Sequence, residues 1–230
     1  MSRIIIIETS TALTSVALAE NGEITSYRES TQMREQAALT APFVQEILTE
    51  KGIGVKDCSA VCVSKGPGSY TGLRVGVSTA KGLCFGAGIP LISVGTLDSL
   101  IYEAIDGGLL PEGCKYIVPM IDARRMEVYT AVFTSDGRQL AETEPMVVDS
   151  GSFSQYLEDG PVLFIGDGAQ KCSGILANAN AHFHQCNPKA SSMLRPAEKA
   201  FNEKRFEDVA YFEPFYLKQF IPTVGKHKVF

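Results

Sequence analysis

The sequence predicts an α/β protein with two lobes, each built from a mixed sheet and flanking helices. Residues 60–88 have the pattern of a buried strand, a glycine-rich turn and a helix. Residues 106–113, DGGLLPEG, are glycine-rich and contain a proline, which is typical of a domain boundary. The same order of elements (strand ending in a carboxylate, hairpin, strand leading into a helix) occurs on both sides of this boundary. We therefore expect an N-terminal lobe over residues 1–105 and a C-terminal lobe over residues 106–230.

Composition and charge exclude several classes of protein. A chain of 230 residues with 45% hydrophobic residues can bury a substantial core. A net charge of −5 argues against a protein that binds nucleic acid alone, and the basic residues 225–228 are interpreted as a solvated end. Six cysteines without a C-x-x-C pair indicate reduced, mostly buried thiols. No signal-peptide pattern and no run of about 20 apolar residues is found, so we expect a cytoplasmic protein without membrane contact.

The N-terminal lobe begins with a strand whose apolar run ends at Glu8. The dipeptide Asn21-Gly22 between two further strands is a strong hairpin signal. Pro42 predicts a kink in the following helix, and Gly52 ends it. In order, we expect strands over 3–8, 15–19 and 24–28, a helix over 32–51, a strand over 60–63, a helix over 72–86, a strand over 91–94 and a helix over 97–105.

The C-terminal lobe repeats this order less clearly. Its expected elements are strands over 116–121, 128–133 and 162–165, a helix that follows Gly166-Asp167-Gly168 and runs through 176, and a helix over 197–204. Residues 178–193 are polar and irregular, and the aromatic residues 212–217 are expected to pack.

The helix over 72–86 carries small residues at helical spacing. Gly72, Gly76, Ala80 and Cys84 form one stripe, and residues 78, 82 and 86 (Ser, Gly, Gly) form a second beside it. Each interior glycine costs about 1 kcal/mol relative to alanine, so close approach by another element is expected. That element is either part of the same fold or a partner subunit, and because a helix has two faces, both interpretations can hold.

Polar residues at two predicted strand ends could line a ligand cleft. Glu8, Thr9 and Ser10 follow the first strand, and Asp122 follows the first strand of the second lobe, which is where open α/β sheets bind ligands. The alternatives are a turn whose hydroxyls satisfy backbone amides, and a local pair of Asp122 with Arg124. The glycine turn 65–69 lacks both standard nucleotide spacings. Because a helix N-terminus favours anions, weak nucleotide binding is one interpretation of this turn. A purely structural turn is the favoured one.

The sequence gives little support for a metal site or a catalytic triad elsewhere in the chain. His182, His184 and Cys186 have metal-ligand residue types, but a zinc site usually needs four ligands and no second group is apparent. An irregular polar loop is the favoured interpretation. With three histidines at 182, 184 and 227, no Ser-His-Asp arrangement can be assembled.

The segment KGPGSYTGLRVG at 65–76, with AKGL at 80–83, closely resembles the signature of the TsaB family, also called YeaZ. Further similar segments are IETS at 7–10, VGTL at 94–97, IDAR at 121–124, EVY at 127–129 and PFYLK at 214–218. The resemblance implies the actin-like ATPase fold (ASKHA, ribonuclease-H-like) with two duplicated lobes. It also implies a role in making threonylcarbamoyladenosine on tRNA, beside the anticodon. In that system TsaB is the partner of TsaD, its paralogue, which holds the metal and transfers the threonylcarbamoyl group, and the ATPase TsaE joins them.

One segment separates the two paralogues. TsaD-type enzymes have V-N-H-L-E-G-H after the equivalent helix, and its two histidines hold the metal. Here residues 94–100 read VGTLDSL, so Thr96 and Leu100 replace the histidines, and leucine cannot bind a metal. Gln36 stands where some family members have histidine. We therefore expect no catalytic residue and no metal site or cofactor in this chain, with ATP and metal handled by the partner subunits.

The sequence therefore favours a non-catalytic subunit that binds and activates a TsaD-type partner together with TsaE and reaches tRNA through the complex. The expected interface lies on the two helices of the N-terminal lobe, which could also form a homodimer in isolation. Its candidate residues are Gln36, Thr40, Val44, Gly72, Gly76, Thr79, Ala80 and Leu83. The alternative is a stand-alone enzyme, either a metallopeptidase-like hydrolase or an ATP phosphotransferase that uses Glu8 and Asp122. Direct tRNA binding by this chain alone is disfavoured by its charge.

Overall fold

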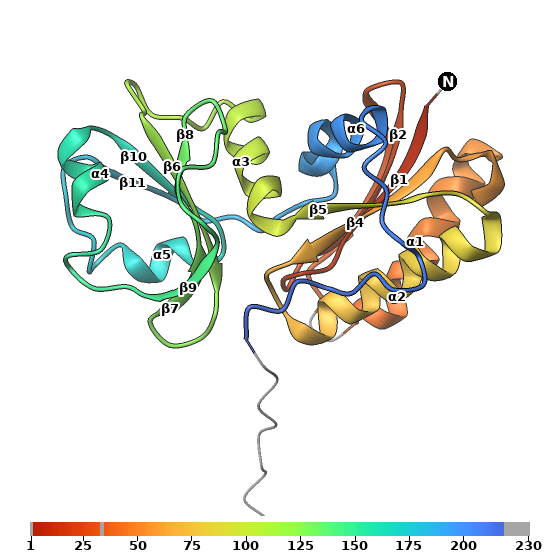
Figure 1. The fold of residues 1–230 in the computed structure, drawn as a ribbon, viewed down its shortest axis with the longest axis horizontal. Helices are drawn as coiled ribbons and strands as arrows, with labels where there is room; N and C mark the ends of the chain where they lie inside the picture. The colour runs from red at the N-terminus through yellow and green to blue at the C-terminus, as the bar shows by residue number, and fades with distance from the viewer. Residues whose placement is uncertain (1, 33–34, 219–230) are drawn as a thin grey trace, which may run out of the picture.

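The computed structural model describes residues 2–32 and 35–218 and contains two lobes, each with its own sheet (Figure 1). The N-terminal lobe has the strand order β3-β2-β1-β4-β5. These strands are β1 (Arg3–Glu8), β2 (Thr14–Glu20), β3 (Glu23–Ser30), β4 (Ala60–Gly66) and β5 (Leu91–Gly95). Because β1 pairs antiparallel with β2 and parallel with β4, the sheet is mixed, as predicted.

Both faces of this sheet are covered by helices. Ile5 and Ile7 of β1 lie in a core cluster with residues of α1 (Gln36–Lys51) and α2 (Tyr70–Ala87). Ile4 and Ile6 lie in a second cluster on the opposite face, with residues of α6 (Leu194–Asn202). Successive side chains of a strand point to opposite faces, so an unbroken apolar run suits a strand that is covered on both sides.

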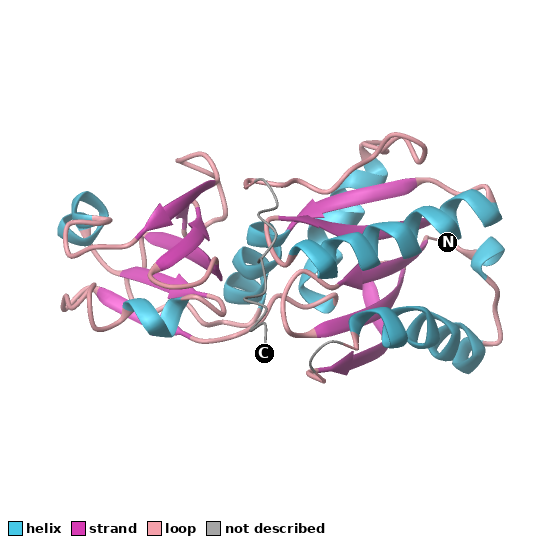
Figure 2. Ribbon diagram, turned by 90° about the horizontal axis from the view of Figure 1, so that it is seen from below, coloured by secondary structure: helices cyan, strands magenta, loops and turns pink. Residues whose placement is uncertain are grey.

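The sheet of the C-terminal lobe has the order β11-β10-β6-β7-β9, with β8 paired to β6. Its strands are β6 (Tyr116–Asp122), β7 (Glu127–Thr130), β8 (Phe133–Thr134), β9 (Glu144–Val147), β10 (Val162–Ile165) and β11 (Ala181–His184). The remaining helices are α3 (Thr96–Asp106), α4 (Ser154–Asp159) and α5 (Ala169–Cys172), with 3-10 turns at Val55–Asp57 and Ser191–Met193. Figure 2 shows the two lobes side by side, each with helices against its sheet.

The core clusters show which sheet α3 and α6 pack against. Leu97, Leu100 and Ile101 of α3 are buried with strand residues of the C-terminal lobe. Ala197 and Ala200 of α6 are buried against the N-terminal sheet. Asp106 is the last residue of α3, and residues 107–113 of the glycine-rich segment form the loop that follows it.

Residues 205–218, here called the C-terminal strap, run back along the N-terminal lobe (Figure 1). The backbone N–H of Glu207 donates to Leu91 O at the edge of the sheet, and that of Phe215 donates to Lys65 O at 2.7 Å. The ammonium group of Lys81 on α2 donates to two strap carbonyls, those of residues 210 and 212, at 3.1 and 3.0 Å. Lys218 then forms an ion pair with Glu127 of β7 in the other lobe. The strap therefore contacts both lobes.

Several predicted elements differ in detail. The strand expected over 128–133 is divided between β7 and β8, and the helix expected through 176 ends at Cys172. Residues 181–184, expected to be irregular, form edge strand β11. Within the described ranges no helix has the length and apolarity needed to cross a bilayer. Positions 33–34 of the predicted first helix and the basic residues 225–228 lie outside the described residues.

Candidate functional site

The first glycine stripe of α2 packs against the chain's own β1–β2 turn. A Cβ atom built on Gly72 would lie 2.0 Å from Thr9 O, and one on Gly76 would lie 2.3 Å from Thr9 Oγ1. The Thr9 hydroxyl donates to Gly72 O at 2.8 Å. Ser69 caps the helix by accepting a hydrogen bond from the Gly72 N–H at 3.3 Å. Glycine is therefore required on this face because the turn approaches the helix backbone closely.

Most of the predicted interface residues lie inside the N-terminal lobe. Five of the eight candidate residues are buried inside the N-terminal lobe: Thr40, Val44, Gly72, Gly76 and Ala80. The other three, Gln36, Thr79 and Leu83, are half-buried. The spacing of small residues predicted a close approach correctly, but it could not show that Thr9 makes that approach.

The second stripe of α2 faces outward. Phe85 is 86% exposed, and a Cβ atom built on Gly82 or Gly86 would meet nothing within 4 Å. Ser78 on the same helix is exposed, as are three alanines of the neighbouring α1, at positions 37, 38 and 41. We call these seven residues the α1–α2 face. Its α2 part combines one large apolar side chain with small residues that permit close approach of another helix.

Glu8 lies at the C-terminal end of β1 and is fully buried. Its Oε1 accepts hydrogen bonds from Ser10 N at 2.6 Å and from Ser64 Oγ at 2.8 Å, whereas Oε2 has no partner among the described residues. Burial raises the pKa of the Glu8 carboxyl, against the lowering effect of these hydrogen bonds. Thr9 and Ser10 are also buried. The predicted cleft residues of this lobe therefore form an enclosed turn, in which Glu8 accepts from the Ser10 amide.

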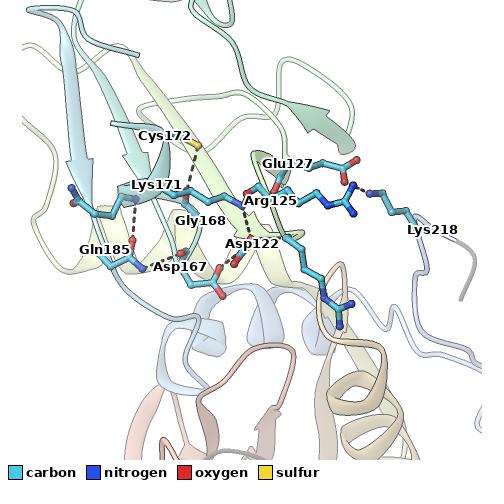
Figure 3. Close-up of polar contacts among 11 residues, drawn as sticks. Asp122, Arg125, Glu127, Asp167, Gly168, Lys171, Cys172, Gln185 and Lys218 are labelled. Carbon is cyan, nitrogen blue, oxygen red and sulfur yellow. Dashed lines mark hydrogen bonds and ion pairs between the residues drawn. The ribbon is translucent and has the colours of Figure 1, made fainter. Parts of the chain in front are cut away.

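Asp122 belongs to a separate polar network in the C-terminal lobe (Figure 3). Lys171 of α5 forms an ion pair with Asp122 and donates to the carbonyl oxygens of Arg125 and Glu127 at 2.8 and 2.7 Å. Three acceptors match the three donors of an ammonium group. The carboxylate of Asp122 also accepts from the N–H of Arg124 at 2.7 Å, so the predicted Asp–Arg pair is a contact with the backbone amide.

Asp167 completes this network. Its Oδ1 accepts from the Asp122 N–H at 2.9 Å, and its own carbonyl accepts from Gln185 Nε2 at 2.9 Å. Burial and, to a lesser extent, the charge of Asp122 raise the pKa of Asp167 to about 6. Sequence reasoning missed Lys171 and Asp167, although the segment Gly166-Asp167-Gly168 marked the right turn. Among the described residues, no hydrogen bond joins this network to Glu8.

The remaining candidates do not form a metal site. Within residues 2–32 and 35–218, no three His, Cys, Asp or Glu side chains converge on a point where they could hold a metal ion. His182 is exposed on edge strand β11, and His184 lies two residues further along it. Thr96 and Leu100, the two positions compared above with metal-binding histidines, are fully buried in α3.

Comparison with known proteins identifies the family. The family model described as "TsaD: tRNA N6-adenosine threonylcarbamoyltransferase" matches residues 30–219. The "tRNA threonylcarbamoyladenosine biosynthesis protein TsaB" of Escherichia coli K12 is 32% identical over 226 residues, which cover 94% of each chain. The chain belongs to the TsaB family. The TsaB of Bacillus subtilis 168 is 29% identical over 224 residues, covering 94% of this chain and 93% of its own.

Solved structures confirm the predicted fold. YeaZ from Pseudomonas aeruginosa superposes with a TM-score of 0.82 at 24% identity, covering 94% of this chain and all of its own. The polyphosphate/ATP-glucomannokinase of Arthrobacter sp. strain KM superposes with a TM-score of 0.50 at 8% identity, covering 89% of this chain and all of its own. The TsaB-family chain thus has the two-lobed actin-like ATPase fold that the sequence predicts.

Proposed function

We propose that this chain acts in tRNA threonylcarbamoyladenosine biosynthesis as a non-catalytic subunit that binds and activates a TsaD-type transferase, together with a TsaE-type ATPase. The names of its relatives support the pathway. The observation that carries the role is the α1–α2 face, where Phe85 is almost fully exposed beside two glycines with open space around them.

Glycines inside a helix lower its stability unless a close contact requires them. Each interior glycine destabilises a helix by about 1 kcal/mol relative to alanine. Gly72 and Gly76 are required by the turn at Thr9, but Gly82 and Gly86 make no such contact within the chain. A partner helix that approached these two glycines closely would account for them, and burial of Phe85 would contribute roughly 2 kcal/mol to the association.

The polar residues support an accessory role over the alternative of a stand-alone enzyme. Glu8 is enclosed by its own turn, and the carboxylate of Asp122 is bound to Lys171 and a backbone amide. Burial closes Glu8 off from a substrate in solution, and the ammonium group of Lys171 offsets the charge of Asp122. A net charge of −5 favours contact with tRNA through the complex and not through this chain alone. The complex would act in the cytoplasm, where tRNA is modified. In isolation the same face could pair with a second copy.

The test is co-purification of the full chain with a TsaD-type partner. Gly82→Leu places a bulky side chain on the face, and Gly174→Leu makes the same change on the other lobe, where a Cβ atom also meets nothing within 4 Å. Gly82→Leu and Phe85→Ser should abolish or strongly reduce recovery of the partner, while Gly174→Leu should match the wild type. Wild-type recovery with both face variants would refute the interface. Robust ATP or peptide hydrolysis by the chain alone would favour the enzyme.

A further inference from the structure

The C-terminal strap exposes an unusual number of aromatic side chains. Of the seven large hydrophobic side chains that are exposed within the described residues, four lie between positions 206 and 216 of the strap. They are Phe206, Tyr211, Phe215 and Tyr216, with exposed fractions of 43%, 84%, 44% and 37%. Tyrosine and phenylalanine are enriched at the centres of protein interfaces, so their concentration here indicates a binding surface.

The strap backbone is held in place. Lys81 on α2 donates to two of its carbonyls, and its residue 215 donates to Lys65 O. The backbone of Glu207 also pairs with Leu91 at the edge of β5. The aromatic rings are therefore presented by a fixed segment, which lowers the entropy that a partner must overcome on binding.

A groove of about 490 Å³ opens between the strap and the end of β4. Its lining includes Lys65, Glu207, Asp208, Tyr211, Glu213 and Phe215. Three of these residues are carboxylates and one is an ammonium group, so the groove has an excess of negative charge. It shares no residue with the α1–α2 face.

The three carboxylates are not equally engaged. Glu207 accepts a hydrogen bond from Ser93 Oγ at 2.5 Å. One oxygen of Asp208 accepts from the backbone N–H groups of residues 210 and 211, which leaves its second oxygen available. Glu213 is exposed and has no hydrogen bond or ion pair with any other described residue. Glu213 and Asp208 are therefore the groups in this groove best able to receive a cation.

We propose that this groove binds a basic segment of a partner protein, with a lysine or arginine side chain against Tyr211 and its charge facing Glu213 and Asp208. Aromatic faces and carboxylates both attract a guanidinium or ammonium group, and the apolar stem of such a side chain packs on a ring. Nucleic acid does not suit the site, because its phosphates would meet three carboxylates. A second copy of this chain carries a net charge of −5 and is disfavoured by the same argument.

The test measures binding of a dye-labelled peptide of glycine and serine that carries two arginines, by fluorescence anisotropy with the full chain. Binding should weaken as salt is added, and a peptide with glutamates in place of the arginines should not bind. Tyr211→Ala and Glu213→Gln should each weaken binding by about two- to fivefold. Lys65→Met removes the cation of the groove and should therefore strengthen binding of the arginine peptide. Glu158→Gln, an exposed acid on α4 of the other lobe, is the matched control and should change nothing.

Three results would overturn the proposal. The first is no saturable binding up to about 1 mM peptide. The second is equal binding of the glutamate peptide or unchanged affinity in both Tyr211→Ala and Glu213→Gln. The third concerns the chain's own basic end, residues 225–228. If replacing Lys226 and Lys228 by alanine tightens peptide binding several-fold, that segment is the occupant and no partner needs to be invoked. Because these variants leave the α1–α2 face intact, failure here is distinguishable from failure of the proposed function.

Discussion

Alanine substitutions at two glycines of α2 should change stability in opposite directions. A Cβ atom on Gly76 would lie 2.3 Å from Thr9 Oγ1 and 3.3 Å from Val63 Cγ2, whereas one on Gly82 would meet nothing within 4 Å. Both positions are inside the same helix, so the gain from replacing glycine is the same at each, about 1 kcal/mol. Only Gly76→Ala introduces a steric conflict.

The free-energy cost of that conflict has two parts, overpacking against Thr9 and the loss of a hydrogen bond. Overpacking of a rigid interior typically costs about 1–3 kcal/mol. Displacing the Thr9 hydroxyl would also break its 2.8 Å hydrogen bond to Gly72 O, which is worth about 1 kcal/mol. Offset by the helix gain, Gly76→Ala should lower the free energy of unfolding by about 1–3 kcal/mol. Gly82→Ala should raise it by about 1 kcal/mol.

Urea unfolding followed by circular dichroism measures both values. Low protein concentration keeps association of the α1–α2 face from contributing to the apparent stability. If Gly76→Ala stabilises the chain as much as Gly82→Ala does, the close contact with Thr9 does not exist, and the assignment of the two stripes to two different roles is refuted.

Three further predictions concern the polar contacts. Lys171→Met removes three charge-assisted hydrogen bonds around Asp122 and should lower the free energy of unfolding by about 2–3 kcal/mol, measured by urea titration, whereas no loss would show that the network is dispensable. The pKa of Asp167 is raised to about 6, so the folded state keeps a proton that the unfolded state releases above its ordinary pKa of 3.8. Stability should therefore fall as pH rises from about 4 to about 6, and Asp167→Asn should lack that fall in pH-dependent unfolding. Lys81→Met frees the strap carbonyls and should speed proteolytic cleavage within residues 205–218, seen by mass spectrometry, while the equally mild Lys56→Met should not.

Much of the N-terminal lobe could be predicted because its signals are local. The apolar run Ile4–Ile7 predicted a strand, and its isoleucines alternate between two core clusters. Asn21 and Gly22 both have positive φ, 51° and 86°, as a tight hairpin turn requires. These features depend on neighbouring residues, so a single sequence contains the information.

The parts that could not be predicted depend on contacts between distant segments. The apolar spacing of Ala197 and Ala200 shows that α6 buries one face, but no local signal indicates that the face covers the N-terminal sheet. The aromatic residues 212–217 were expected to pack, and Phe212 does pack against the core, but Phe215 and Tyr216 are exposed. For the same reason the spacing on α2 could not show that Gly72, Gly76 and Ala80 are buried inside the lobe, since periodicity identifies a face but not what lies against it.

Reconstitution of tRNA threonylcarbamoylation tests the central claim most directly, that the outward stripe of α2 serves a TsaD-type partner. The reaction is measured with TsaD-type and TsaE-type proteins, ATP, threonylcarbamoyl adenylate as the group donor, tRNA, and either no added chain, the wild type, Gly82→Leu or Gly174→Leu. The account predicts that the wild type and Gly174→Leu support modification equally, and that Gly82→Leu gives the low level seen without the chain. Full modification with a correctly folded Gly82→Leu variant, or without any added chain, would contradict it.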